Sequence, residues 1–346
     1  MKDDQAKTLK HYWRQRGSTL ILAMWSLLLL TTFAVQLGII VRQKITLVRR
    51  LDNRDKRARI AEAGVKYAIA QLRKPDILFG ADFLSEQWSD QRDLFEDRKV
   101  GQGSFTISHY FHDGENSRVM YGLEDEERKI NINKSDVDVL IRLLQNTAGL
   151  GRKESEELAY SIVDWRDNDS FFQHPQYGAE DSDYRGRQYS YEAKDSEFEV
   201  IEELLLVNKM DQEIFDKIRD FVTIYGEGKV NINTASKEVL LALGIRDYVA
   251  ENILLFRRGG DLVSGTGDDD IFLQESTIVS RLSQTFDLSP SEVGSLSNLV
   301  AAGQFCVKSE NFMIKSVARL GYLKGQTAIV AVSDRTGKIK YWREEI

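Results

Sequence analysis

STLILAMWSLLLLTTFAVQLGIIV, residues 18–41, contains neither a charged residue nor a proline. An apolar run of about 20 residues is long enough to cross a bilayer as a helix. A soluble helix of that length is rarely apolar on all sides. The stretch is therefore predicted to be a transmembrane helix.

The charges that flank this run predict its orientation. Ahead of it stand five basic and two acidic residues: Lys2, Lys7, Lys10, Arg14 and Arg16, against Asp3 and Asp4. The positive-inside tendency places this short N-terminus in the cytoplasm and the large C-terminal part across the membrane. Arg42, Lys44, Arg49 and Arg50 follow the run closely, so the charge asymmetry is moderate.

Three kinds of N-terminal segment fit an apolar run near the start of a chain. A secretory signal has a shorter apolar core and a small-residue cleavage box on its far side; here the far side reads Gly-Ile-Ile-Val-Arg42. A plain anchor assigns no role to Arg16-Gly17 before the first apolar residue. Basic residues, Gly17 and then Ser18 resemble a type IV prepilin leader. That resemblance implies cleavage between Gly17 and Ser18, N-methylation of Ser18 and retention of the helix.

One position departs from the usual pilin pattern. Most pilins and pseudopilins carry Glu at the fifth mature position, which is Leu22 here. An intramembrane carboxylate is costly unless it is paired, so its absence suggests a subunit without a neighbour on that side. Lack of this Glu resembles the protein K family of type II secretion, the large minor pseudopilins. The resemblance implies a bacterial inner-membrane protein with a periplasmic C-terminal part.

Composition limits the remaining possibilities. The 346 residues allow an anchor and about two domains. The net charge of -7 argues against a dominant nucleic-acid surface. Cys306 is the single cysteine, so neither an intrachain disulfide nor a cysteine-rich zinc site is possible.

The helical pattern continues beyond the membrane run. Apolar residues recur at spacings of three and four as far as Leu72, and no proline intervenes before Pro75. One helix over about 20–73 is predicted, with two helices broken near 51–55 as the alternative. Alternation over 103–111 and 118–123 predicts two strands that begin a pilin sheet. Segments 305–308, 312–319, 327–332 and 339–342 predict an antiparallel meander.

An internal repeat lies between these strands. KININ, residues 129–133, matches KVNIN, residues 229–233, and a predicted helix follows each copy. Helices are predicted near 136–148, 153–165, 197–207, 211–223, 236–244, 246–258 and 275–284. Strands on both sides of a helical block again resemble protein K, over nearly the whole chain.

The predicted fold class is α+β. A long N-terminal transmembrane and amphipathic helix packs on an antiparallel pilin-like sheet, and a large all-α domain is inserted between the strands. The predicted organisation is a leader over 1–17, a transmembrane helix over 18–41, a pilin-domain helix with first strands over 42–125, an inserted α domain with two helix-hairpin-helix-like repeats over 126–303, and C-terminal pilin strands over 304–346.

Two acidic clusters flank a proline-containing loop. Calcium takes six to eight oxygen ligands, and folding this loop back brings both clusters together. The spacing is not that of an EF-hand. Asp-Trp, then Asp-x-Asp, then Gly-Ala-Glu-Asp-x-x-Tyr resembles a hallmark of the family, which implies calcium in the helical domain. The candidate ligands are Asp164, Asp167, Asp169, Glu180, Asp181 and Asp183.

The predicted function is structural. No nucleophile elbow, phosphate loop or zinc-hydrolase helix occurs in the sequence, so no enzyme activity is expected. The resemblance implies a minor pseudopilin at the tip of a periplasmic pseudopilus that takes part in protein secretion across the outer membrane. Its implied partners are other minor pseudopilins and the prepilin peptidase. The alternatives are a membrane-anchored DNA-uptake protein that uses the two hairpins, although no nucleic acid is expected, and a tethered periplasmic enzyme.

Overall fold

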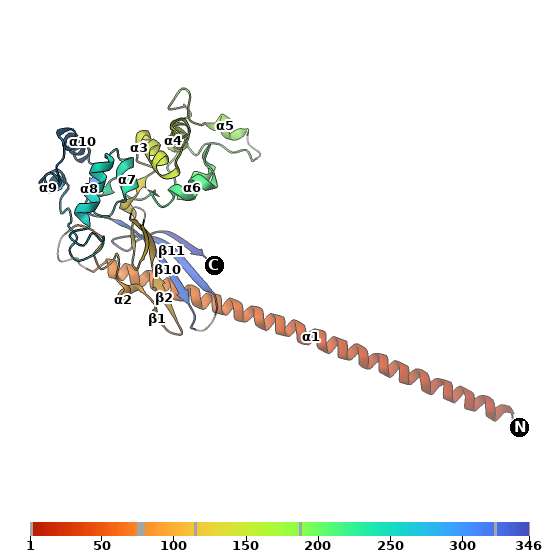
Figure 1. Ribbon diagram of the computed structural model, residues 1–346. Helices are drawn as coiled ribbons and strands as arrows, with labels where there is room; N and C mark the ends of the chain where they lie inside the picture. The colour runs from red at the N-terminus through yellow and green to blue at the C-terminus, as the bar shows by residue number, and fades with distance from the viewer. Residues whose placement is uncertain (1–2, 75–79, 114–115, 187–188, 322–323, 346) are drawn as a thin grey trace. The chain divides into compact units, whose positions relative to one another are not determined.

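The computed structural model describes residues 3–74, 80–113, 116–186, 189–321 and 324–345, and of the first 18 residues only the backbone. Contacts divide the chain into two compact units, Met1–Arg57 and Ala58–Ile346. Helix α1, Asp3–Leu72, begins in the first unit and ends in the second (Figure 1).

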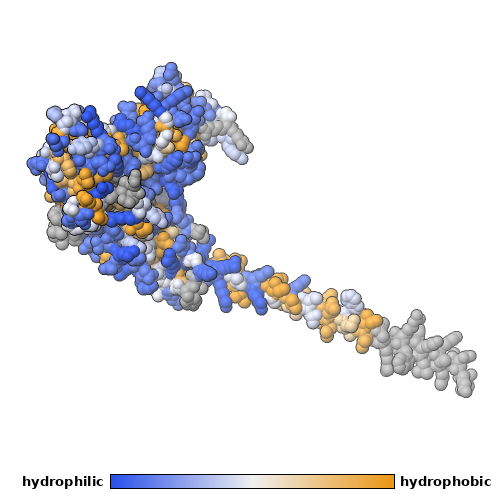
Figure 2. All heavy atoms as spheres, in the orientation of Figure 1, coloured by the Kyte–Doolittle hydropathy of each residue, from blue (hydrophilic) through white to orange (hydrophobic). Residues whose placement is uncertain are grey.

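The first unit is helical throughout its described length. Helix α1 has no break, so the alternative of two helices parted near 51–55 is wrong. Among the described residues, one helix has the length and composition to cross a membrane, with a mean hydropathy of 2.1 over its 18-residue window. The large apolar side chains of this run are exposed within the unit, and they form the orange stretch beside the grey end in Figure 2.

The second unit is built on an antiparallel sheet in the order β1-β2-β10-β11-β12, with β5 also paired to β10. The strands are β1 (Arg98–Val100), β2 (Gly103–Ile107), β5 (Glu124–Asp125), β10 (Asn311–Arg319), β11 (Gln326–Asp334) and β12 (Ile339–Glu345). The meander predicted over 312–342 is confirmed for these last three strands.

The last turns of α1 cover one face of the sheet. Ala61, Val65 and Ala68 are fully buried there with Phe105 and Phe312 from the strands. The helix approaches the sheet closely at Gly64, where a Cβ atom would lie 2.2 Å from Ser316 Oγ. The amphipathic half of the predicted helix therefore packs on the sheet as expected.

A separate hairpin corrects part of the strand prediction. The expected strand over 103–111 is divided at Ser108 into β2 and β3 (His109–Asp113). Strand β3 pairs with β4 (Asn116–Met120) in a two-stranded sheet of its own, so only β2 joins the main sheet. Alternation of polar and apolar residues continues through Ser108 and gives no sign of this change of partner.

Helices follow one another between β5 and β10. They are α3 (Val137–Leu143), the π-helical turn η2 (Leu144–Ala148), α4 (Arg152–Arg166), α5 (Asp181–Arg185), α6 (Gln212–Ile218), α7 (Lys237–Ala242), α8 (Asp247–Arg257), α9 (Ile278–Thr285) and α10 (Pro290–Ala301), with 3₁₀ turns at Glu126–Arg128, Ile201–Leu206 and Glu275–Thr277. Helix α10 was not predicted.

Two short strand pairs lie among these helices. Strand β6 (Ile130–Asn131) pairs parallel with β7 (Val222–Thr223), and β8 (Val230–Asn231) pairs parallel with β9 (Phe305–Cys306). The prediction that 305–308 belongs to the meander is therefore wrong. We call the part from β6 to β9 the helical segment. It has its own apolar core, and Figure 1 shows its helices on the side of the sheet away from α1.

Candidate functional site

The internal repeat seen in the sequence is also a repeat of hydrogen bonds. Asn131 Oδ1 accepts from the backbone N–H of Asn133 at 2.9 Å, and Asn231 Oδ1 accepts from that of Asn233 at 3.0 Å. The side-chain amide of Asn133 donates to the backbone carbonyl of Phe198 and accepts from the backbone N–H of Phe198. The side chain of Asn233 makes the same two hydrogen bonds with the backbone of Phe272. The Asn-Ile-Asn pattern fixes a turn before each helix.

An arginine from the following helix closes each turn. Arg166 of α4 donates to the carbonyls of Ile132 and Ser135. Arg257 of α8 donates to the carbonyls of Ile232 and Ala235. The guanidinium groups thus supply hydrogen-bond donors to backbone carbonyl oxygens of the turns, which lie outside regular helices and strands.

The two copies differ in what the first asparagine binds. The Asn131 amide donates to the carbonyls of Tyr225 and Gly226, at 2.9 and 3.0 Å. The Asn231 amide instead donates to Asp125 Oδ2 at 3.1 Å, Ser309 Oγ at 2.9 Å and the Asp82 carbonyl at 3.2 Å. The second copy is therefore bonded to the sheet and its preceding loop.

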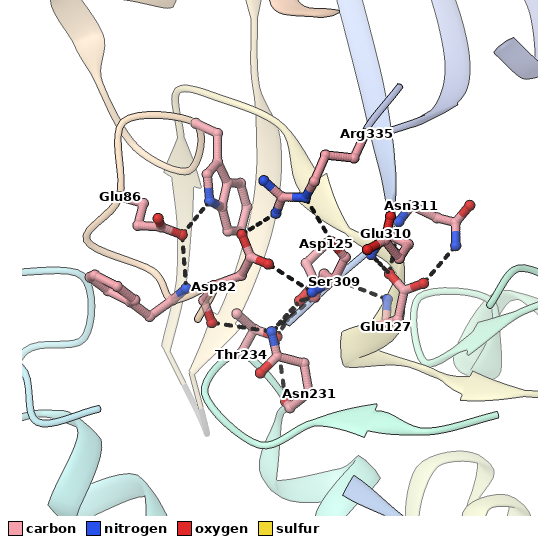
Figure 3. A network of polar contacts seen from close by, with 12 residues as sticks. Asp82, Glu86, Asp125, Glu127, Asn231, Thr234, Ser309, Glu310, Asn311 and Arg335 are labelled. Atoms are coloured by element: carbon pink, nitrogen blue, oxygen red, sulfur yellow. Dashed lines mark hydrogen bonds and ion pairs between the residues drawn. The ribbon is translucent and has the colours of Figure 1, made fainter. Parts of the chain in front are cut away.

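We call the surroundings of Asn231 the polar junction (Figure 3). Asp125 Oδ2 also accepts from Thr234 Oγ1 at 2.5 Å and from Ser309 Oγ at 2.8 Å. The Asp82 carboxylate accepts the Ser309 N–H at 2.7 Å and forms an ion pair with Arg335. All of these groups except Arg335 are buried, so each bond forms away from water.

Glu127 extends the polar junction towards β10. Its Oε1 accepts from Asn311 Nδ2 at 2.6 Å, and its Oε2 accepts from the N–H groups of Asn311 at 3.0 Å and Glu310 at 3.3 Å. Figure 3 shows these contacts beside the strand. The carboxylate joins the start of the helical segment to the sheet.

The polar junction belongs to a run of charges that the sequence analysis missed. EDEERK, residues 124–129, is buried at all six positions, with exposed fractions of 7% or less. Lys129 Nζ lies 2.8 Å from Glu126, and Arg128 lies over the ring of Phe111. A run of charges normally indicates a solvated loop. Buried charges require partners, and those partners come from distant parts of the chain.

The buried carboxyls predict a pH dependence of stability. Burial raises the pKa of Asp125, and burial together with the Asp125 charge raises the pKa of Glu127. The folded chain then holds protons that the unfolded chain, with carboxyl pKa values of about 4, has lost. The stabilising contribution is complete below that value and is lost as pH rises through the folded pKa values.

We expect the free energy of unfolding of the full chain in detergent to fall by about 2 kcal/mol from about pH 5 to pH 8. The measurement is urea denaturation at constant calcium. Glu127→Gln should flatten the profile, whereas Glu310→Gln, which changes a neighbouring exposed carboxylate, should leave it unchanged. Parallel profiles for the chain and Glu127→Gln would contradict the assignment.

The acidic loop predicted to bind calcium folds back on the end of α4. Asp164 is fully buried, and its two oxygens accept from the N–H groups of Gln173 and Ala179, at 3.1 and 3.0 Å. Gly178 has a φ of 109°, and a Cβ there would lie 2.0 Å from Asp164 Oδ2. Asp164 therefore holds both ends of the loop, and glycine is required beside it.

Two predicted ligands have buried oxygens with no hydrogen-bond partner among the described residues. These are Oδ1 of Asp167 and both carboxylate oxygens of Glu180, a side chain only 4% exposed. Burial, together with the charges of Asp164 and Asp167, raises the pKa of Glu180 to about 7. Unpaired carboxylate oxygens that repel one another fit a cation.

The other predicted ligands are already bonded. Asp169 Oδ1 accepts the Phe171 N–H at 2.9 Å. Asp181 pairs with Arg185 at 2.7 Å and accepts the Ala193 N–H at 3.0 Å. Asp183 accepts the Glu180 N–H at 3.2 Å at the start of α5. The structure thus assigns local bonds to these three carboxylates.

Asp195 was not predicted. Its Oδ1 is a further buried oxygen without a partner in the described residues, and its φ is 51°. The Asp195 charge raises the pKa of Asp167 and of Glu180. Nothing in the sequence around Asp195 distinguishes it. Within the described ranges, no three His, Cys, Asp or Glu side chains form a ready-made metal group.

The predicted leader junction lies within α1. Gly17 and Ser18 are helical in backbone, and their side chains fall outside the described part. Leu22 is 70% exposed in the first unit. Leader cleavage and methylation therefore stay predictions.

Comparisons with known proteins agree on one family. Residues 119–227 match the family model for type II secretion system protein K. The type II secretion system protein K of Pseudomonas aeruginosa is 29% identical over 255 residues, which cover 69% of this chain and 72% of that protein. A chain in the crystal structure of the GspK-GspI-GspJ complex of enterotoxigenic Escherichia coli is similar with a TM-score of 0.62 and 17% identity. That match covers 88% of this chain and 99% of the other.

An apolar N-terminal helix that continues onto an antiparallel sheet defines the class of pilin-like subunits. The large helical segment between β5 and β10 distinguishes this chain from a plain pilin domain. In sequence and in fold, the chain is similar to protein K of type II secretion systems.

Proposed function

We propose that the chain is a minor pseudopilin that acts structurally at the tip of a periplasmic pseudopilus. It is anchored by residues 18–41 in the bacterial inner membrane, with a cytoplasmic N-terminus. It assembles with other minor pseudopilins and takes part in protein secretion across the outer membrane. It catalyses no reaction in this role.

The observation that carries this proposal is the position of the helical segment in the sheet. The segment enters from β5 and leaves into β10, and these two strands pair with each other. The segment is therefore an elaboration of one pilin-like unit, which supports the inserted domain predicted from the sequence. A subunit of this bulk would obstruct another subunit stacked above it, and this favours the end of a filament.

Co-assembly tests the proposal. The full chain in detergent should co-purify with the other minor pseudopilins of its own secretion system, and deletion of its gene should stop secretion until the chain is restored. The alternative of a DNA-uptake protein gains no support from the comparisons. Binding of duplex DNA at physiological salt, together with failure to co-purify, would replace the proposal by that alternative.

Leader processing gives a second test. The mature chain should lack residues 1–17 and carry one methyl group on Ser18, as measured by intact-protein mass spectrometry. Gly17→Ala should leave the leader attached. Gly38→Ala changes a glycine within the same helix that has open space around its Cβ position, and it should be processed normally. An uncleaved natural chain would contradict the prepilin assignment.

We also propose that the acidic loop holds a structural calcium ion. Glu180, Asp167 and Asp195 supply the unpartnered oxygens, Asp169 lies in the same acidic loop, and Asp164 stands at the end of α4 beside it. Calcium also takes backbone carbonyl and water oxygens, so the site does not require all its carboxylates to be assembled beforehand. When bound, the ion neutralises the repulsion among these carboxylates and stabilises the loop.

A further inference from the structure

A band of positive charge follows the membrane run on α1. Four basic side chains lie within nine residues of Val41, and we call them the basic collar: Arg42, Lys44, Arg49 and Arg50. All four are exposed. Among the residues that the structure describes, none of the four has an acidic partner. Figure 2 shows hydrophilic residues along the helix after its apolar stretch.

The charge of the two units is divided. Met1–Arg57 contains twelve basic and four acidic residues, which leaves thirty-five basic and fifty acidic residues for Ala58–Ile346. An anionic surface would therefore attract the collar and repel the folded unit. The basic collar is a local feature of the helix and does not reflect the composition of the chain.

The position of the collar matches the level of lipid headgroups. Arg42 directly follows the last apolar residue, and Arg50 lies about 12 Å further along the helix. The headgroup region is about 5 to 8 Å deep on each side of the hydrocarbon core. Long basic side chains bend towards an interface. The side chains at both ends of the collar, Arg42 and Arg50, can therefore reach lipid phosphate groups.

The arrangement around the helix also fits lipid. With about 100° of rotation per residue, Arg42, Arg49 and Arg50 fall on one half of the helix, and Lys44 falls on the opposite half. A flat protein partner would meet one side of a helix, whereas lipid surrounds it. Basic residues on the translocated side oppose the positive-inside tendency. They therefore weaken the charge difference that orients the helix, and their presence needs another explanation.

We propose that the basic collar binds anionic phospholipid headgroups in the membrane leaflet where the apolar run ends. The proposal rests on the membrane span of the proposed function. Each basic residue near a charged membrane surface adds to the attraction, so the collar would fix the depth at which α1 leaves the bilayer. Anionic lipid would then gather around the base of this subunit.

The test reconstitutes the full chain in phosphatidylcholine vesicles and measures the lipid held at the protein by electron paramagnetic resonance. Spin-labelled phosphatidylglycerol should be preferred over spin-labelled phosphatidylcholine by roughly fivefold. The preference should fall at about 1 M salt, which screens charges beyond about 3 Å. The basic residues of the leader stay the same in every variant.

Two matched double variants separate headgroup contact from charge in general. Arg42→Gln with Lys44→Gln should remove most of the preference. Arg54→Gln with Lys56→Gln removes two charges about 18 Å from Arg42. This variant should keep nearly the full preference for phosphatidylglycerol. Equal losses, or no preference in the natural chain, would overturn the proposal.

A protein partner is the other outcome. If the Arg42 and Lys44 variant keeps its lipid preference but no longer co-purifies with other pilin-like subunits, the collar binds acidic protein and the lipid proposal fails. A chain that co-assembles normally yet shows no lipid preference refutes this inference and leaves the proposed function intact.

Discussion

Removal of calcium is expected to lower the unfolding temperature of the full chain by about 10 °C. A ligand present at several hundred times its dissociation constant stabilises the folded state by about 3 to 4 kcal/mol, and about 3 °C corresponds to each kcal/mol in a domain of this size. Without the ion, Glu180, Asp167 and Asp195 keep buried carboxylate oxygens that lack donors. The measurement is thermal unfolding in detergent, with added calcium and with chelator.

The variant Glu180→Gln should change the unfolding temperature in opposite directions with and without calcium. The variant should be more stable than the natural chain in chelator, because the change removes a buried charge that its acidic neighbours repel. It should also gain nothing from calcium. Asp270→Asn alters an exposed carboxylate in another acidic run, which pairs with Arg281 at 3.1 Å, and it should keep the full calcium response. An identical melt of the natural chain with and without chelator would exclude a structural ion.

Asn231→Ala is the second substitution with a large expected effect, a loss of about 3 kcal/mol in the free energy of unfolding. The change removes three hydrogen bonds donated by the amide and one accepted from Asn233. It leaves the Asp125 carboxylate buried with fewer donors, and unsatisfied buried groups cost about 1 to 3 kcal/mol each.

The repeat supplies the control for this substitution. Asn131→Ala removes the equivalent side chain of the first copy, whose amide donates, among the residues that the structure describes, to the carbonyls of Tyr225 and Gly226. Those two residues are partly exposed, so water can replace the amide, and a loss of about 1 kcal/mol is expected. Urea denaturation of both variants measures the difference. Equal losses would show that the polar junction adds nothing to the bonds within the turn.

The elements that sequence predicted correctly have local signals. Helix α1 carries an apolar run and then apolar residues at helical spacing, and the two Asn-Ile-Asn copies are alike over adjacent residues. The strands of the C-terminal meander alternate and are joined by turn residues. In each case the residues that carry the sequence pattern are the residues that form the element.

The features that sequence missed depend on distant partners. Strand β9 looks like the first strand of the meander, but its partner is β8, which lies beyond the helices of the second copy. The run 124–129 has the composition of an exposed loop, and its burial depends on Thr223, Ser309 and Asn311. Asp195 joins the acidic loop only because the chain returns there after α5. Single-sequence patterns carry no information on such pairings.

The insertion of the helical segment between β5 and β10 has a consequence for the order of folding. Strand β2 pairs with β10 over Ser104 to Ile107, so the centre of the sheet joins residues from opposite ends of the second unit. Contacts between distant residues form slowly, because a long loop must close before they can form. The helix pairs of each copy can form early from nearby residues. The sheet, together with the burial of the 124–129 charges, cannot form until β10, β11 and β12 have been synthesised. The new chain therefore passes through a period in which α1 has no sheet to pack against.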